Sequence, residues 1–265
     1  MTDFEPAMLP ARPLPAVAVP LGKIVLGGPS SLLAAPLVGD TEDALLMEAE
    51  QAAARGPDLL EWRADCLQGL VPERVPRLLE ELRRRTGLPV LFTCRAGFEG
   101  GTGCFAEPER LALLESAIES KLADLVDVEL ATEEAARDRL LALGQGNDVP
   151  VMLSAHDWQT TPPEPDLLDW LAREQMAGAA VAKIATMART PQDGLRLLSA
   201  CAVARASFLR IPLVGIAMGP AGAFTRVLGP LFGVDLTFAA AVGSSAPGQL
   251  DLHNVREARR LLGVA

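Results

Sequence analysis

The chain has 265 residues, 49% of them hydrophobic and 22% charged, with a formal net charge of −10. This composition is typical of a globular protein, and the excess of acidic residues argues against a nucleic-acid partner, because phosphate backbones require clustered lysine and arginine. No apolar stretch is long enough to span a membrane, and the acidic start, with Asp3 and Glu5, is unlike a secretory signal. We therefore expect a cytoplasmic protein without nucleic-acid or membrane partners.

The first thirty residues are predicted to form a tail and a hairpin ahead of the main domain. Residues 1–15 are rich in proline and alanine and show no periodicity. Ala16–Val19 and Lys23–Leu26 are short β-prone pieces on either side of a Pro-Leu-Gly turn. A small hairpin of this kind could close one end of a barrel.

From Leu32 onward, short apolar runs alternate with longer amphipathic stretches. The predicted strands are Leu32–Gly39, Leu59–Asp65, Pro89–Arg95, Leu125–Leu130, Val149–His156, Ala179–Ala185, Pro212–Met218 and Leu236–Val242. Helical spacing marks the segments between them, among which are Thr41–Arg55, Pro72–Arg85, Pro108–Leu122, Pro165–Met176 and Pro191–Ala206. The alternation predicts an α/β fold, a single-domain (β/α)8 TIM barrel over residues 31–265, with a doubly wound sheet as the alternative.

Polar residues gather at the carboxyl ends of the predicted strands, where barrel enzymes carry their active sites. These residues are Glu61, Arg63, Asp65, Arg95, Asp127, Glu129, Ser154, His156 and Lys183. Their positions predict one polar pocket at that end of the barrel.

Lys183 is one of only three lysines and lies in the apolar run Ala179–Ala185. Burial disfavours the ammonium form and favours a neutral, nucleophilic amine that can attack a ketone. An ion-paired structural lysine is the alternative.

The chain has two histidines and no tyrosine, so few side chains can transfer protons near neutral pH. His156 ends a predicted strand, where it could act as a base or serve as a structural residue. His253 is expected to begin a solvated helix.

Further candidates lie on strands and in loops. Glu61 and Arg63 share a strand face, and they predict either a buried salt bridge or contacts to a hydroxylated substrate. Arg95 ends a strand, and Glu99 lies in the glycine-bearing loop after it. Arg226 stands close to a helix start, which favours an anion.

Residues 244–249 form a loop of small residues that could close over a substrate.

The four cysteines, Cys66, Cys94, Cys104 and Cys201, contain no CxxC pair and are expected to be reduced structural thiols. No ligand spacing for a metal and no nucleotide motif occurs, so we expect neither a metal nor a cofactor.

Taken together, these segments resemble type I 3-dehydroquinate dehydratase, from about Pro36 to the last helix. The motifs that carry the resemblance are Glu61-Trp62-Arg63-Ala64-Asp65, Phe92-Thr93-Cys94-Arg95 with Glu99-Gly100-Gly101, Ser154-Ala155-His156-Asp157, Val181-Ala182-Lys183-Ile184-Ala185, Met218-Gly219 with Arg226, and Ser245-Ala246-Pro247-Gly248-Gln249. The resemblance implies a hydro-lyase of the shikimate pathway, leading to chorismate and aromatic amino acids, that acts on the small molecule 3-dehydroquinate. It also implies a homodimer.

The resemblance also implies roles for single residues. Lys183 would form an imine with the C3 ketone, His156 would act as general acid and base, and Glu99 would orient it. The implied substrate-binding residues are Glu61, Arg63, Arg95, Met218, Arg226, Ser245 and Gln249.

Three positions depart from common family patterns without removing a catalytic group: Pro36, Ala155 and Pro220. Two other functions stay open. A class I aldolase also uses an imine-forming lysine, but a sugar-phosphate aldolase needs a phosphate cradle of backbone amides. A non-catalytic metabolite sensor is expected to have lost the lysine or the histidine.

Overall fold

The computed structural model describes residues 12–103 and 105–264. Most of the expected tail, residues 1–11, and Cys104 therefore lie outside the described residues. Within them, Cys66, Cys94 and Cys201 are free thiols, as expected. No helix in the described part of the chain has the length and apolar character needed to cross a bilayer.

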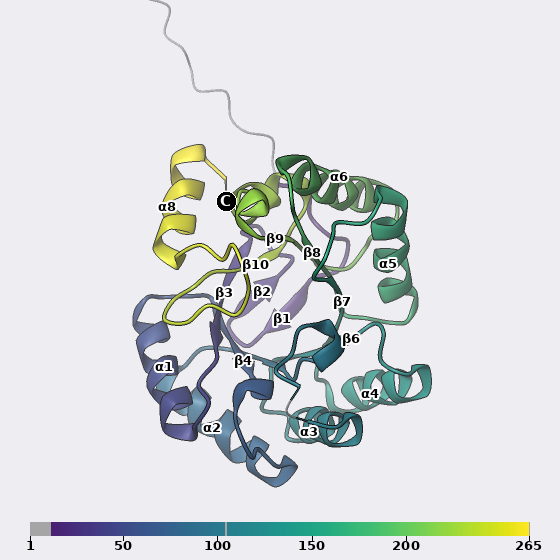
Figure 1. Ribbon diagram of the computed structural model, residues 1–265. Coiled ribbons are helices and arrows are strands. Elements are labelled where there is room, and N and C mark those ends of the chain that lie inside the picture. The colour runs from purple at the N-terminus through teal and green to yellow at the C-terminus, as the bar shows by residue number, and fades with distance from the viewer. Residues whose placement is uncertain (1–11, 104, 265) are drawn as a thin grey trace, which may run out of the picture.

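Eight parallel strands form the centre of the molecule, which confirms the predicted barrel over the doubly wound alternative (Figure 1). They are β3 (Leu32–Leu37), β4 (Leu59–Arg63), β5 (Val90–Thr93), β6 (Leu125–Glu129), β7 (Val151–Asp157), β8 (Val181–Met187), β9 (Leu213–Met218) and β10 (Leu236–Phe238). From β3 to β9 each strand pairs with the next one in the chain, and β10 pairs with β3, so that β9 and β10 stand at the two ends of the sheet order.

Seven of the eight strands end one to four residues from the predicted end, and the pairing around two of them gives the reason. The last strand was predicted to reach Val242, but β10 ends at Phe238 because Ala240 forms an isolated bridge with Asp251. Strand β8 extends two residues beyond the predicted Ala185, since Thr186 still pairs with β7 and β9, and Met187 with β9.

One acidic residue joins the last two strands. The backbone N–H of Asp235 donates to the Leu213 carbonyl at 2.7 Å, and its carboxylate accepts the Leu213 N–H at 2.7 Å. Its own carbonyl accepts the Leu32 N–H at the start of β3. The fully buried carboxylate is balanced by Arg205 and Arg12. Asp235 thus closes the barrel between β9 and β10.

Helices form the outer ring (Figure 1). They are α1 (Glu42–Ala54), α2 (Val75–Thr86), α3 (Glu107–Glu119), α4 (Glu134–Asn147), α5 (Glu164–Met176), α6 (Pro191–Ser207), the short α7 (Thr225–Leu228) and α8 (Leu252–Leu262). The helix predicted over Pro72–Arg85 begins with a 3-10 turn, Pro72–Arg74, and Pro76 then lies in the first turn of α2, where its missing N–H costs nothing. His253 is exposed at the start of α8, as expected.

The predicted hairpin is present as β1 (Val19–Leu21) and β2 (Ile24–Leu26), paired antiparallel. Leu21 and Leu26 are buried and share one apolar cluster with Leu59, Leu91 and Leu125 from the amino-terminal parts of β4, β5 and β6. The hairpin therefore closes the amino-terminal end of the barrel. The division of the chain at residue 31 stays a prediction.

Side chains on β4 alternate between the barrel interior and the helix layer. Trp62 packs outward with Leu45 and Leu79, and its ring meets Phe92 edge-on at 5.1 Å. Glu61 and Arg63 must then face inward, because strand side chains alternate. This geometry gathers charged groups inside the carboxyl-terminal half of the barrel.

Candidate active site

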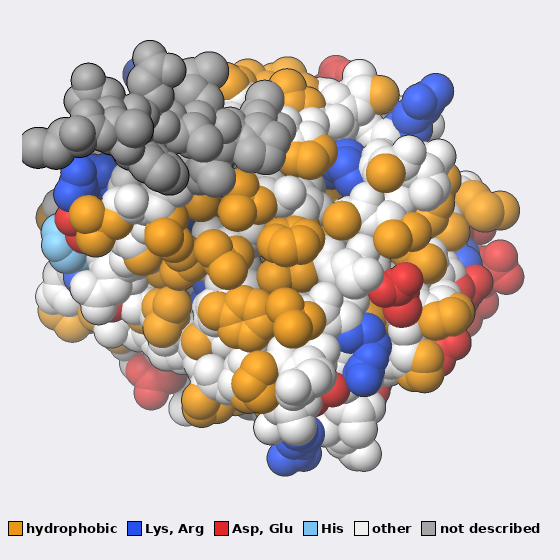
Figure 2. Space-filling model, turned by 90° about the horizontal axis from the view of Figure 1, so that it is seen from above, with side chains coloured by type: hydrophobic (Ala, Val, Ile, Leu, Met, Phe, Trp, Pro, Cys, Tyr) orange, Lys and Arg blue, Asp and Glu red, His pale blue; other side chains and the backbone are white. Residues whose placement is uncertain are grey.

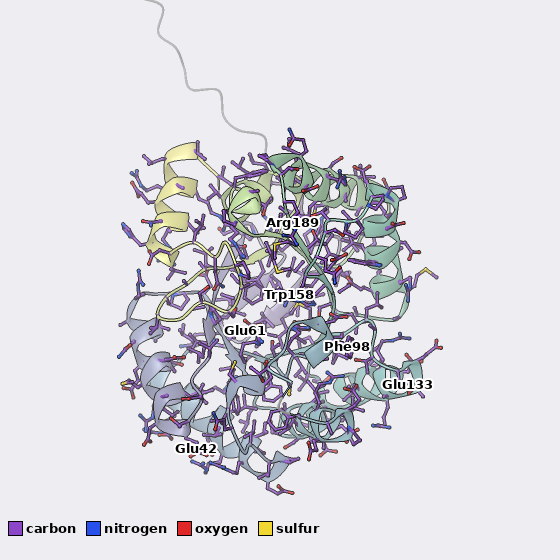
Figure 3. All side chains as sticks on the ribbon, in the orientation of Figure 1. Glu42, Glu61, Phe98, Glu133, Trp158 and Arg189 are labelled. Carbon is purple, nitrogen blue, oxygen red and sulfur yellow. The ribbon has the colours of Figure 1, made fainter. Side chains whose placement is uncertain are left out.

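A cavity of about 450 Å³ opens at the carboxyl ends of the strands. Nine of the ten catalytic and substrate-binding residues expected from the sequence line it. The tenth, Glu99, contacts the lining residue His156. The lining residues are Glu61, Arg63, Arg95, His156, Trp158, Lys183, Ala185, Ile216, Met218, Arg226, Phe238, Ser245, Ala246 and Gln249. Figure 3 shows Glu61 and Trp158 near the centre of the ring, whereas Glu42 and Glu133 lie in the outer layer.

Lys183 reaches the cavity from β8. Its Nζ lies 2.7 Å from Oδ2 of Asp127 and 4.7 Å from the centre of the Phe238 ring. Only 4% of the residue is exposed. The two interpretations of this lysine are therefore compatible, since it is ion-paired and also lines the cavity.

Asp127, on β6, was noted in the sequence as a polar strand end but not as a site residue. Its Oδ2 also accepts from Arg95 Nη2 at 2.6 Å, and Ser154 Oγ donates to Oδ1 at 2.5 Å. Burial opposes ionisation of this carboxyl, but the positive charges of Arg95 and Lys183 outweigh it and lower its pKa. Asp127 is therefore a carboxylate that holds Lys183 and Arg95 together.

Arg95 extends this buried ion cluster toward the helix layer. Its Nη1 donates to Glu129 Oε1 at 2.8 Å, and Arg110 Nη1 donates to the other oxygen of Glu129 at 2.6 Å. Glu129 also accepts the backbone N–H of Ala96 at 3.0 Å. With so many acceptors inside the protein, Arg95 balances charge beneath the cavity as well as lining it.

His156, on β7, is paired with Glu99. Its Nδ1 lies 2.8 Å from Glu99 Oε2, which leaves Nε2 as the ring nitrogen available to a ligand. Burial raises the pKa of Glu99 to about 8, and burial together with the charge of Arg95 lowers the pKa of His156 well below 6.5. Both shifts favour a pair without net charge.

Trp158 holds the Glu99 loop, and the sequence analysis did not recognise it as a site residue. Its indole N–H donates to the Glu99 carbonyl at 2.7 Å. Gly100 has a φ of 85°, and a Cβ there would lie 2.1 Å from the Trp158 ring. The ring thus packs on a backbone position that only glycine can occupy.

Glu61 and Arg63 do not pair with each other, so of the two alternatives for this pair the salt bridge is wrong. Arg63 instead makes a bidentate pair with Asp65, with both contacts at 2.8 Å. Glu61 accepts from Thr93 Oγ1 at 3.0 Å. Two residues apart, Arg63 and Asp65 meet because the chain turns into a 3-10 helix after β4.

Arg226 and Gln249 present free donors to the cavity. The Nε and Nη1 of Arg226 bind the carbonyls of Gly248 and Phe238, and its Nη2 has no partner among the described residues. The Gln249 Oε1 accepts the Ser245 N–H, while its Nε2 is likewise unpartnered within the described chain. Burial lowers the pKa of Arg226 to about 10, so the guanidinium is still charged at neutral pH. These donors fit a small anion.

The loop that carries Ser245 and Gln249 packs on the end of β9. Gly219 N–H donates to the Pro247 carbonyl at 3.0 Å, and a Cβ at Gly248 would lie 2.3 Å from the Gly219 carbonyl oxygen. Within residues 12–103 and 105–264, no cluster of three or more histidine, cysteine or acidic side chains is arranged to hold a metal ion.

The fold and the cavity define a class of protein: a (β/α)8-barrel enzyme with a buried lysine in a pocket for a small anionic molecule. The chain belongs to the type I 3-dehydroquinase family, whose model matches residues 33–265.

Similar proteins agree on this family. The 3-dehydroquinate dehydratase of Shouchella clausii is 42% identical over 228 residues, covering 85% of this chain and 89% of the relative. That of Aromatoleum aromaticum is 37% identical over 244 residues, covering 91% and 94%. The crystal structure of the Geobacillus kaustophilus enzyme matches with a TM-score of 0.90 and 38% identity, over 94% of this chain and 97% of that one.

The ion cluster beneath the cavity yields a stability prediction. Glu129→Gln leaves Arg95 and Arg110 short of a buried negative charge, so the free energy of unfolding should fall by about 3 kcal/mol. Urea unfolding measures the change. Glu107 is a half-exposed partner of the same Arg110, and Glu107→Gln should cost less than about 1 kcal/mol. Equal losses in the two variants would contradict a buried, mutually dependent cluster.

Proposed function

We propose that this cavity dehydrates 3-dehydroquinate to 3-dehydroshikimate through an imine on Lys183, with His156 as acid and base. The chain is accordingly a carbon–oxygen lyase of the shikimate pathway. One observation carries the residue-level proposal: Lys183 and His156 line the same small cavity, where their strands are adjacent.

The chemistry follows from the groups in the cavity. Lys183 gives one ammonium proton to His156, and the resulting amine adds to the C3 carbonyl. His156 returns the same proton to the departing oxygen, so that water leaves and a protonated imine remains. This nitrogen draws electrons from C2, so the neighbouring C–H becomes acidic enough for a histidine. His156 Nε2 takes the C2 proton and returns a proton to the C1 hydroxyl, which leaves as water. Hydrolysis of the imine releases the product and restores the amine.

Asp127 can serve throughout this sequence. It contacts Nζ of Lys183 before reaction, and a protonated imine carries its positive charge on the same nitrogen. The carboxylate therefore stabilises both states without moving, which is the preorganised electrostatic arrangement that enzymes use.

The remaining residues are assigned to binding. The substrate carboxylate would be held by Nη2 of Arg226, Nε2 of Gln249 and Ser245. The first two atoms have no partner within the described residues, and Ser245 is bonded to the Gln249 side chain through its backbone N–H. Glu61, Arg63 and Arg95 would contact hydroxyls and balance charge, and Met218 would pack on the ring.

The two alternative functions fit less well. A sugar-phosphate aldolase needs several backbone amides around a phosphate, whereas the unpartnered donors among the described lining residues belong to two side chains, Arg226 and Gln249. A non-catalytic sensor has no need for a lysine and a histidine in one cavity. Family membership favours the hydro-lyase over both.

The imine is tested by mixing the protein with 3-dehydroquinate and borohydride, which reduces an imine to a stable amine. Intact mass and peptide mapping should place one adduct on Lys183. Lys183→Ala should form no adduct and lose turnover, whereas Lys23→Ala, which removes an exposed lysine, should behave as the unaltered protein. Product formation without an adduct would refute the proposed step.

The Glu99–His156 pair predicts a pH dependence. His156 can accept a proton at Nε2 only when its Nδ1–H donates to an ionised Glu99. Because burial raises the pKa of Glu99 to about 8, kcat/KM should rise with pH and level off above about 8. At lower pH the protonated Glu99 donates to Nδ1, and the ring hydrogen moves to Nε2.

The Glu99→Gln variant distinguishes the titration of Glu99 from that of His156. The amide oxygen accepts Nδ1–H at every pH, so His156 alone titrates, and its pKa is lowered well below 6.5. The acid limb of kcat/KM should move to lower pH, while the plateau falls about tenfold because the charged partner is lost. An acid limb that stays near pH 8 in this variant would contradict the assignment.

A homodimer is a further proposal, implied by the resemblance. What supports it is a hydrophobic face: Figure 2 shows hydrophobic side chains gathered on the side where α6 and α8 lie, and Leu195, Val203, Leu261 and Leu262 on these helices are exposed. Light scattering should give twice the chain mass of 28.0 kDa. A monomer at micromolar concentration would contradict it.

The cytoplasmic location stays a prediction, and the three free thiols support it.

A further inference from the structure

Glu174 is a carboxyl group in an apolar interface outside the barrel. Helix α5 turns Leu167, Leu171 and Glu174 toward the sheet, and all three are buried. Leu167 and Leu171 pack with Ala182 and Ile184, which flank Lys183 on β8. Glu174 is 0% exposed, in a helix stripe where the other members are leucine.

Among the described residues the side chain of Glu174 makes one hydrogen bond, and that bond goes to the reacting residue. Its Oε2 accepts the backbone N–H of Lys183 at 2.9 Å. Its Oε1 is buried and has no partner among the described residues. Burial raises the pKa of Glu174 well above 4.5, which favours the uncharged acid.

Packing alone does not account for this residue. A methionine or leucine would fill the same space without an unpartnered polar oxygen, which is unfavourable in an apolar environment. The compensating gain is the bond to the Lys183 N–H. Lys183 is thereby held from two sides, at its backbone by Glu174 from the helix layer and at Nζ by Asp127 from inside the barrel.

We propose that Glu174 is a positioning residue for the reaction, which fixes the backbone of Lys183 so that Nζ meets the substrate carbonyl. The proposal rests on the imine at Lys183. Attack on a carbonyl requires the nucleophile to be placed to within about an ångström, and a displacement of the Lys183 backbone would move Nζ out of that position. Glu174 touches no substrate and acts through the backbone of Lys183.

Three substitutions separate positioning from packing. Glu174→Gln keeps the length and an oxygen that accepts the Lys183 N–H. Glu174→Met keeps the length and removes the acceptor. Leu171→Ala is the matched control, because it opens a cavity in the same interface without touching Lys183. Rapid mixing with saturating 3-dehydroquinate, followed by a borohydride quench, measures the rate of adduct formation by intact mass, and Tm is measured alongside.

Adduct formation should be about tenfold slower in Glu174→Met, with little change in KM, and within about threefold of the unaltered rate in Glu174→Gln. Leu171→Ala should lower Tm at least as much as Glu174→Met and still form the adduct at close to the unaltered rate. Unaltered trapping in Glu174→Met, or equal slowing in Leu171→Ala, would overturn the positioning role.

Two further outcomes are informative. If Glu174→Met does not fold, Glu174→Asp replaces it, because a carboxyl one methylene shorter cannot reach the Lys183 N–H; it should also slow trapping, and an unaltered rate would overturn the proposal. If the unaltered protein forms product but no adduct, the imine itself is refuted and the inference fails with it. An adduct that forms equally fast in every Glu174 variant refutes the inference alone.

Discussion

The negative charge of Asp127 inside the barrel is the constraint on which the site depends. A carboxylate in this position is stable only because Arg95 and Lys183 lie within hydrogen-bond distance of it. Arg95 in turn requires Glu129, and Glu129 requires Arg110 on α3. The cluster therefore ties the reacting lysine to a helix of the outer ring. Loss of one member leaves the next with an uncompensated charge.

The apolar side chains that stabilise the barrel and the charged groups of the site occupy opposite halves along its axis. Its amino-terminal half is filled by leucines and closed by the hairpin, and the charged groups occupy the carboxyl-terminal half. The loops at that end are held by the site residues themselves, as the bond from Trp158 to the Glu99 carbonyl shows. Because the apolar half supplies the packing, the polar half can hold buried charges that would otherwise destabilise a small fold.

The fold was predictable from the sequence because its signals are local. The eight strands were recognised from short apolar runs, and the polar strand ends identified most of the cavity lining, because parallel strands bring their carboxyl ends to one side. What could not be predicted were partners far apart in the chain. Trp158 and Glu174 each contact a site residue from another element, and Arg110 contacts Glu129 beneath the cavity. A buried arginine or glutamate on an amphipathic helix has no periodic signature that distinguishes it from a solvated one. The pairing of Arg63 with Asp65 was missed because Asp65 was assigned to the predicted strand, whereas the chain turns into a 3-10 helix after Arg63.

The closure at Asp235 bears on how the chain folds during synthesis. The strands β3 to β9 and their helices can assemble as they leave the ribosome, but β3 and β9 are then unpaired edges of an open sheet. Only after residue 235 has emerged can β10 fill the gap, with Asp235 bonding to Leu213 on one side and Leu32 on the other. A nascent chain that pauses before this point exposes two strand edges to other chains, which is a known route to aggregation. The interval between the synthesis of β9 and that of β10 is thus when this barrel is most exposed to misassembly.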